Sequence, residues 1–245
     1  MKRTRLIIYI LLAMIAAGCG ENEMLSYENE PAVYFAHETY GQRDSISHSF
    51  FLLNTTILSD TVYIKVNTMG QISSQDRPIS LIQTNVGKPE AAVAGKHYVS
   101  FDDAGMKERL WIPANSAEAN IPIVFIRDPS LALGQIRLEL AIEKNEYFRP
   151  GIDAWRTFII TTTDQAVRPA LWDTRWRTFF GSTWGSIKMR FIIDATGYTE
   201  WGVTPSDMSY LTFLRNTVLQ KFDEYNAAHP DEPLKEADGE LVRFN

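Results

Sequence analysis

The sequence predicts a mainly β protein, in which an antiparallel β-sandwich at residues 31–164 is followed by a small α/β domain at residues 165–245. Short segments between Pro31 and Thr163 alternate apolar and polar residues with a period of two, as strands with one buried face do. No stretch of this region repeats apolar residues at the three- and four-residue spacing of an amphipathic helix. The composition then changes near Asp164 to Pro169, and four of the six tryptophans follow close together.

Residues 135–143 show the strand pattern most clearly. The apolar residues from Ile136 to Ile142 share one face, and mainly charged residues lie on the other. One buried and one solvated face is typical of antiparallel packing. Pro122 lies within another strand and predicts an edge position, because proline cannot donate a hydrogen bond to a neighbouring strand. The other predicted strands are 31–36, 47–53, 61–67, 77–84, 97–101, 109–112, 120–126 and 154–163.

Two helices are expected in the C-terminal domain. Residues 182–197 fit a strand by their alternation and a helix by their single apolar face, and we favour a helix that ends at its final glycine. Ser206 is the predicted N-cap of the next helix, and Asp207 in the first turn favours the helix dipole. Apolar residues at spacings of three and four follow, so this helix has one buried face. A last strand is expected at residues 240–244.

The N-terminus carries a predicted lipoprotein signal peptide at residues 1–18. Three basic residues precede an apolar run from Leu6 to Ala17, which is shorter than the about 20 residues that span a bilayer. The stretch Ala16-Ala17-Gly18-Cys19 resembles the lipobox of bacterial lipoproteins, in which the cysteine is lipidated and becomes the mature N-terminus. The resemblance implies a lipid anchor on Cys19, a tether at residues 19–30 and a place at the outer membrane, on the cell surface or the periplasmic face. An ordinary cleaved signal or an uncleaved anchor is the alternative interpretation.

The balance of charge argues against nucleic acid as a partner. The chain has 24 basic and 30 acidic residues, and three of the basic ones lie in the signal peptide, so the mature chain carries a formal charge of −9. Nucleic-acid binding depends on neutralising phosphates with lysine and arginine, and the sequence has no basic run beyond the signal. Cys19 is the single cysteine, so a lipid on it leaves no thiol for a disulfide and burial has to stabilise the fold.

Several motifs follow one another in the order of a known β-sandwich. They are Ala94-Gly95-Lys96-His97-Tyr98, Leu110-Trp111-Ile112-Pro113, residues 121–128 and Arg137-Leu138-Glu139-Leu140. In this order they are similar to Calx-β domains, which implies an immunoglobulin-like sandwich. Calx-β domains often bind calcium through carboxylates in their loops, but here His97 stands where an aspartate is usual. Calcium needs several converging oxygen ligands, so we expect no metal site from the remaining carboxylates, Asp102, Asp103 and Asp128.

Over most of the mature chain, further short motifs carry a narrower resemblance. They are Ser47-His48-Ser49-Phe50, Asp76-Arg77, Phe180-Gly181 and Ser186-Ile187-Lys188, together with Gly95-Lys96-His97-Tyr98 from the first set. With them the chain resembles an uncharacterised family of surface lipoproteins from gut-type Gram-negative anaerobes. Genes of that family often lie beside starch-utilisation-like uptake systems, which implies a role in glycan uptake or adhesion and an outer-membrane transporter as a partner.

The sequence contains no pattern that indicates catalysis. The four histidines lack metal-ligand spacing, and neither GxSxG nor a glycine-rich phosphate loop is present. His48 and His97 are expected to be structural, hydrogen-bonded side chains. We therefore predict a protein that is not an enzyme and that has no catalytic residue, cofactor or metal.

The tryptophans of the C-terminal domain are expected mainly to form its core, because each buries a large area. If any of them contacts a ligand, the candidates are Trp184 and Trp201, each beside a glycine in a predicted loop. The resulting hypothesis is a membrane-anchored, non-catalytic binding or accessory protein with a glycan or a host-surface molecule as its ligand. The alternatives are a structural partner of an outer-membrane transporter and a glycan hydrolase.

Overall fold

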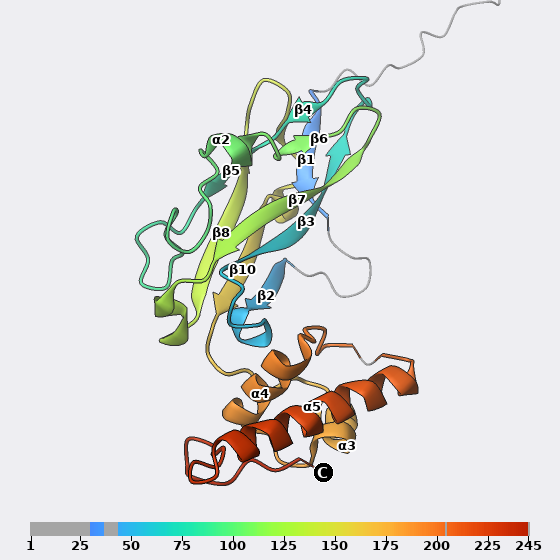
Figure 1. Ribbon diagram of the computed structural model, residues 1–245. Coiled ribbons are helices and arrows are strands. Elements are labelled where there is room, and N and C mark those ends of the chain that lie inside the picture. Colours follow the sequence, from blue (N-terminus) through green and yellow to red (C-terminus); the bar gives the residue numbers. More distant parts are fainter. Residues whose placement is uncertain (1–29, 37–43, 204, 245) are drawn as a thin grey trace, which may run out of the picture. The chain divides into compact units, whose positions relative to one another are not determined.

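The computed structural model describes residues 30–36, 44–203 and 205–244, and all of these except Glu30 lie within a compact unit at Pro31–Asn245 (Figure 1). It contains two four-stranded sheets followed by C-terminal helices, so the predicted mainly β fold class is confirmed. The predicted signal peptide, the lipidated Cys19 and all but the last residue of the tether lie outside the described residues. No helix in the described ranges combines the length and apolar character needed to cross a membrane.

The first sheet has the strand order β7-β3-β1-β9. Its strands are β1 (Ala32–Phe35), β3 (Ser59–Met69), β7 (Glu118–Ile126) and β9 (Arg149–Pro150). The pairing of β3 with β7 is antiparallel and sets Tyr63 opposite Pro122. Because β7 is the outermost strand in the described part of the chain, Pro122 is not required to donate to a strand on its outer side, and the predicted edge position is confirmed.

The second sheet has the order β2-β10-β8-β5. Its strands are β2 (Ser45–Ser49), β5 (Ser80–Gln83), β8 (Ile136–Glu143) and β10 (Thr157–Thr163). Leu138 and Leu140 are fully buried, as the alternation of residues 135–143 predicts. Unlike the antiparallel packing that was expected throughout, β2 pairs with β10, and β1 with β9, in parallel. Both sheets are therefore mixed. Alternation favours an antiparallel sheet but does not exclude a parallel pair, because a strand with one buried face alternates in either direction.

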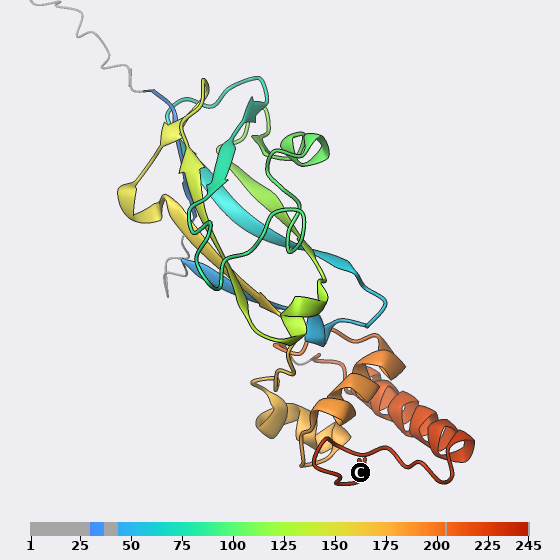
Figure 2. The same ribbon diagram turned by 90° about the vertical axis from the view of Figure 1, so that its left-hand side faces the viewer.

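Smaller elements connect and close the two sheets. They are η1 (Phe50–Leu52), β4 (Arg77–Pro78), α2 (Ala104–Lys107), β6 (Trp111–Ile112), η2 (Pro129–Ala132) and η3 (Asp153–Trp155). The strand predicted at residues 47–53 ends at Ser49, where the 3-10 turn η1 begins. The strand predicted at residues 97–101 is also wrong, because the segment makes only isolated bridges, including one between Tyr98 and Phe125. Residues 84–103 run along the side of the sandwich that faces the viewer in Figure 2.

His48 connects both sheets from within the sandwich. Its Nδ1 lies 2.8 Å from the hydroxyl of Thr162 on β10, and its Nε2 lies 3.0 Å from the carboxylate of Asp60 on β3. The ring also stacks on Phe125 at 5.6 Å. Burial lowers the pKa of His48, more than its contact with Asp60 raises it, so the folded protein favours the neutral imidazole. The expected structural role of this histidine fits these contacts.

The C-terminal part of the compact unit is helical. Its elements are η4 (Trp172–Trp176, a π-helix), α3 (Arg177–Phe180), α4 (Ser186–Thr196) and α5 (Met208–Ala228). The ambiguous segment 182–197 forms a helix over Ser186–Thr196, and Gly197 ends it in the left-handed conformation at φ 66°. The N-cap of α5 is Asp207, one residue later than predicted, and its carboxylate accepts from the amide of Ser209 at 2.7 Å. The strand expected at residues 240–244 is wrong, since only one bridge, from Lys235 to Leu241, forms there.

The hydrophobic residues form two clusters, one between the sheets and one among the helices. Phe51 of η1 belongs to the helical cluster, although it precedes that part of the chain by more than a hundred residues. Arg190 of α4 stacks on Phe51 at 4.6 Å and donates to the carbonyl of Leu53 at 2.7 Å. These contacts join α4 to η1 within the compact unit. The predicted boundary between residues 164 and 165 stays a prediction.

Candidate functional site

Three of the four C-terminal tryptophans lie in the core of the helical cluster. Trp172 and Trp176 are fully buried and Trp201 is 1 % exposed. The Trp201 ring contacts Trp176 at 4.9 Å and Tyr198 at 5.0 Å, and its carbonyl accepts from the indole of Trp176 at 3.1 Å. The expected core role of these residues is confirmed. The idea that Trp201 is an accessible ligand contact is wrong, because distant rings cover it despite its place in a loop.

Trp184 lines a cavity of about 540 Å³ beside the first turn of α4. Lys188, Glu236 and Arg243 contribute charged side chains to the same cavity. The Trp184 ring is half-buried against the helical cluster, and its indole nitrogen is buried without a hydrogen-bond partner in the described part of the chain. The role of Trp184 as a ligand contact stays a prediction.

The charged groups around this cavity mainly cap the N-terminus of α4. The carboxylate of Glu236 accepts from the amides of Ile187 at 2.9 Å and Lys188 at 2.8 Å, two of the donors that a helix leaves unpaired. A side chain at Gly185 would collide with this carboxylate. Lys188 is 4 % exposed and donates to the carbonyl of Thr183, and burial lowers its pKa to about 8 although Glu236 opposes that shift. The arrangement therefore has a structural role as a helix cap.

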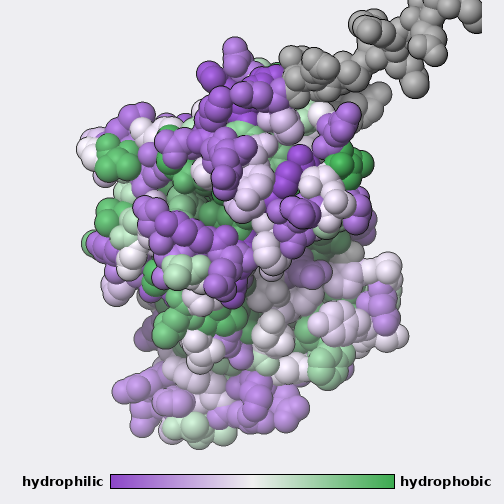
Figure 3. All heavy atoms as spheres, turned by 90° about the horizontal axis from the view of Figure 1, so that it is seen from above, coloured by the Kyte–Doolittle hydropathy of each residue, from purple (hydrophilic) through white to green (hydrophobic). Residues whose placement is uncertain are grey.

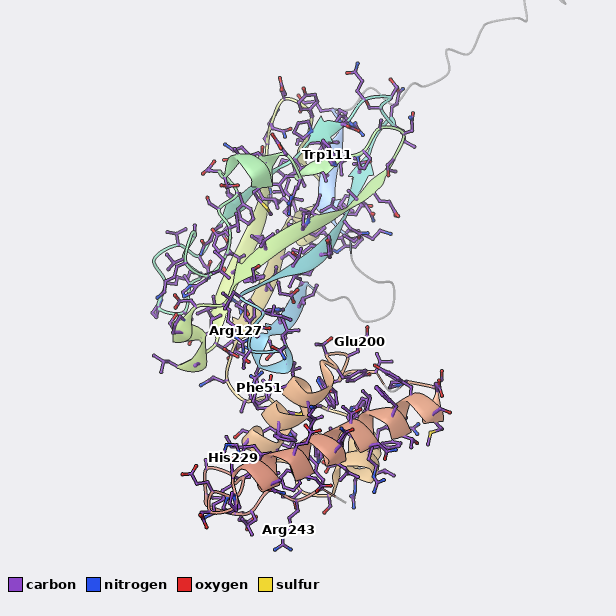
Figure 4. The ribbon with its side chains drawn as sticks, viewed as in Figure 1. Phe51, Trp111, Arg127, Glu200, His229 and Arg243 are labelled. Carbon is purple, nitrogen blue, oxygen red and sulfur yellow. The ribbon has the colours of Figure 1, made fainter. Side chains whose placement is uncertain are left out.

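A second surface has more of the properties of a binding site. It consists of the exposed rings of Tyr210 and Phe213 and the buried ring of Tyr198 beside Tyr210, which we call the aromatic platform. Tyr210 is 41 % and Phe213 is 61 % exposed, and their rings lie 6.3 Å apart with planes only 19° from parallel. Tyr198 and Tyr210 line a cavity of about 390 Å³ together with Thr199 and Glu200. Figure 4 shows Glu200 on the loop that leads from α4 toward α5.

The aromatic platform rests on a rigid base. The hydroxyl of Tyr198 donates to the carbonyls of Glu200 at 3.1 Å and Val203 at 3.3 Å. The Tyr198 ring packs against Trp176 at 5.3 Å and Trp201 at 5.0 Å and lies 6.3 Å from the exposed ring of Tyr210, so the buried rings support Tyr210. Burial also raises the pKa of Tyr198, which keeps its phenol protonated and able to donate these bonds.

Tyr210 and Phe213 were not predicted from the sequence, although a signal for them was present. The buried residues of α5 are Leu211, Leu214 and Val218, which mark the apolar stripe of the helix. Tyr210 and Phe213 are aromatic residues that fall beside this stripe. Two aromatic rings that lie together outside the buried stripe form an exposed apolar patch, and such a patch is more informative than a single exposed residue.

The other sequence candidates are dispersed. Asp103 caps α2 by accepting from the amide of Met106, whereas Asp128 accepts from the amide of Ser130 and lies 3.6 Å from Lys96. No group of three or more histidine, cysteine or acidic residues is arranged to hold a metal in the described ranges.

Trp111 on β6 is 45 % exposed and is labelled on the sandwich in Figure 4. Seen from above, hydrophobic residues form several small groups among hydrophilic ones (Figure 3).

Fold and surface together define a β-sandwich protein with a helical C-terminal part that presents aromatic rings. The chain belongs to the family described as a domain of unknown function, DUF4843, whose model matches residues 27–198. The expected membership of an uncharacterised family is confirmed at this level. Its lipoprotein character and its link to uptake systems stay predictions.

Solved structures from Bacteroides have limited similarity to this chain. One is a protein of unknown function from Bacteroides ovatus, with 18 % identity, a TM-score of 0.35 and coverage of 54 % of this chain and 43 % of that one. Another is a candidate carbohydrate-binding protein from Bacteroides ovatus ATCC 8483, with 13 % identity, a TM-score of 0.34 and coverage of 55 % and 37 %. A third is a two-domain protein of unknown function from Bacteroides fragilis NCTC 9343, with 12 % identity, a TM-score of 0.35 and coverage of 56 % of this chain and 46 % of that one.

In each of these three comparisons the aligned part spans less than half of the solved structure. No curated protein matches the sequence significantly.

Proposed function

We propose that this protein is a non-catalytic glycan-binding accessory protein that a lipid on Cys19 holds at the outer membrane. The observation that carries the binding role is the exposed pair of Tyr210 and Phe213 on its rigid aromatic base. The face of an aromatic ring is electron-rich, and the C–H groups on one side of a sugar ring pack well against it. Rings that are already fixed lose little conformational freedom on binding, which favours affinity.

The polar groups beside the aromatic platform suit the hydroxyl groups of a sugar. Glu200 and Thr199 line the adjacent cavity, and their side chains offer a carboxylate and a hydroxyl for hydrogen bonds. Glycoside hydrolysis requires two carboxyl groups about 5–9.5 Å apart across the scissile bond. Glu200 is the one acidic residue among the described residues that line this cavity. These features favour binding over the alternative of a glycan hydrolase.

Replacing Tyr210 and Phe213 together by alanine is expected to weaken glycan binding by about tenfold or more, because both stacking surfaces are lost. The measurement is the affinity of the mature domain for a panel of neutral and acidic polysaccharides. Tyr63→Ala is the matched control, since Tyr63 is 62 % exposed on β3 and is not part of the platform. Equal binding by the double variant and the parent would exclude the platform as the glycan-binding site. If no polysaccharide of the panel is bound, the glycan-binding role itself is excluded. Release of reducing sugar would favour the hydrolase.

Cys19→Ala is expected to abolish incorporation of labelled palmitate and to remove the protein from the outer-membrane fraction, because no acyl chain is attached. Immunodetection after fractionation of the two membranes measures the second effect. A variant that still incorporates palmitate or still reaches the outer membrane would contradict the anchor. Protease treatment of intact cells then tests the cell-surface face, and crosslinking in cells tests the alternative of docking to an outer-membrane transporter.

A further inference from the structure

The cavity of about 390 Å³ beside the aromatic platform has a negative lining in the part of the chain that the structure describes. The charged residue there is Glu200, which is exposed and forms no ion pair with a described residue. Burial raises the pKa of Tyr198, and the charge of Glu200 and the phenol of Tyr210 raise it further. These three groups therefore act on one another around the same cavity.

The stretch of sequence that carries the platform contains no basic residue. No lysine or arginine occurs between Arg190 and Arg215, whereas three acidic residues do. One of them, Asp207, accepts from the amide of Tyr210 at 3.3 Å as the N-cap of α5. Arg215 does not line the cavity and has an interaction of its own. A cationic ligand is therefore attracted to the platform, and an anionic ligand is repelled from it.

The exposed rings favour a cation as well. The face of an aromatic ring is electron-rich and attracts an ammonium group that lies within about 6 Å of its centre. Tyr210 and Phe213 are both exposed, and Tyr210 lines the same cavity as Glu200. An ammonium group attached to a sugar can therefore use the aromatic faces and the carboxylate together.

The dimensions of the site suit part of a sugar chain. Pockets for small ligands measure about 300–1,000 Å³, and this cavity lies within that range. Thr199 adds a hydroxyl to its lining for hydrogen bonds with a sugar. Phe213 lies 6.3 Å from Tyr210 and outside the lining, so an oligosaccharide can occupy the cavity and both exposed rings at once.

We propose that the aromatic platform binds a glycan with unsubstituted amino groups, whose ammonium pairs with Glu200 while its sugar rings stack on Tyr210 and Phe213. This inference rests on the proposed glycan-binding function and names the class of glycan. A neutral glycan keeps the stacking but lacks the ion pair. A glycan of uronic acids brings its own carboxylates against Glu200, so the affinity decreases from amino to neutral to acidic glycans.

The test compares four β-1,4-linked oligosaccharides of equal length by calorimetry with the mature domain. They are built from glucosamine, N-acetylglucosamine, glucose and glucuronic acid, so they differ mainly in the charge of one substituent. At about pH 6, where the amine is largely protonated, the glucosamine form is expected to bind about tenfold more tightly than the two neutral forms, and the glucuronic acid form most weakly. At about pH 8 the amine loses its proton, and its advantage is expected to disappear.

Glu200→Gln removes the charge and keeps the size of the side chain. It is expected to reduce the affinity ratio between the glucosamine and glucose forms from about ten to about one. Glu224→Gln is the matched control, because Glu224 is 50 % exposed on the same helix as Tyr210 and does not line the cavity. It makes the same change in net charge, so an effect of Glu200→Gln alone identifies the local carboxylate.

Three results would overturn this inference and leave the proposed function standing. They are equal binding of the four forms, tightest binding of the glucuronic acid form, and an amine preference that Glu200→Gln retains. Failure to bind any of the four forms would also overturn it, even if another polysaccharide is bound. If no glycan of any kind is bound, the proposed glycan-binding function fails as well.

Discussion

Trp201→Ala is expected to reduce the free energy of unfolding by about 3–5 kcal/mol, the range for removing a buried tryptophan. Trp201 is 1 % exposed and packs edge to face on both Trp176 and Phe180, at 4.9 and 6.1 Å. Alanine would leave a cavity among rings that cannot all move to fill it, because Trp176 is itself fixed by a hydrogen bond to the carbonyl of residue 201.

Denaturant unfolding of the mature domain measures this loss. Trp111→Ala is the control, since Trp111 is 45 % exposed and its loss is expected to cost less than about 1 kcal/mol. A Trp201→Ala variant with the stability of the parent and a selective loss of ligand binding would contradict the core role. It would instead support the contact that the loop position of this residue predicts.

Asp164→Ala is expected to cost about 3–5 kcal/mol, because it removes one partner of a nearly buried ion pair. Arg127 donates to both carboxylate oxygens of Asp164 at 2.8 Å, and the two side chains are only 9 % and 18 % exposed. Arg190 lies 3.9 Å from the same carboxylate. The guanidinium of Arg127 would then keep only main-chain carbonyls as partners, which do not neutralise it, and Arg190 would lose one of the two carboxylates that act on it, Asp164 and Asp194.

The control is Glu118→Ala, which breaks the pair with Lys65, whose side chains are 59 % and 48 % exposed. A surface pair of this kind contributes about 0–1 kcal/mol, so little change is expected. Chemical unfolding of both variants gives the comparison. Similar stability of Asp164→Ala and Glu118→Ala would show that water screens the Arg127 pair despite its burial. Figure 4 shows Arg127 and Phe51 at the end of the sandwich that lies next to the C-terminal helices.

The regular elements could largely be predicted because the period of apolar residues is a local property. The faces of residues 135–143 and the edge position of Pro122 agree with the structure for this reason. Strand direction could not be predicted, because β2 and β10 meet from positions more than a hundred residues apart. The segment 182–197 was ambiguous since its apolar residues fit two periods, and packing of Met189, Ile192 and Ile193 into the helical cluster selects the helix.

The candidate site was only partly predictable. An aromatic C-terminal part was evident from composition, but Trp201, which was predicted to be an accessible ring, is buried. Proximity to a glycine indicates a loop and says nothing of what packs over it. The exposed rings are Tyr210 and Phe213, which follow from the phase of α5 once its buried stripe is known.

By itself the sequence determined the strand-rich first part, the two longer helices and the prediction of a lipid on Cys19, because each depends on neighbouring residues. The tertiary structure alone decided which rings are exposed and that the tryptophans support Tyr198. Exposure of a side chain depends on groups that are distant in the chain and close in space. The indole of Trp176, which covers Trp201 from twenty-five residues away, is the clearest case.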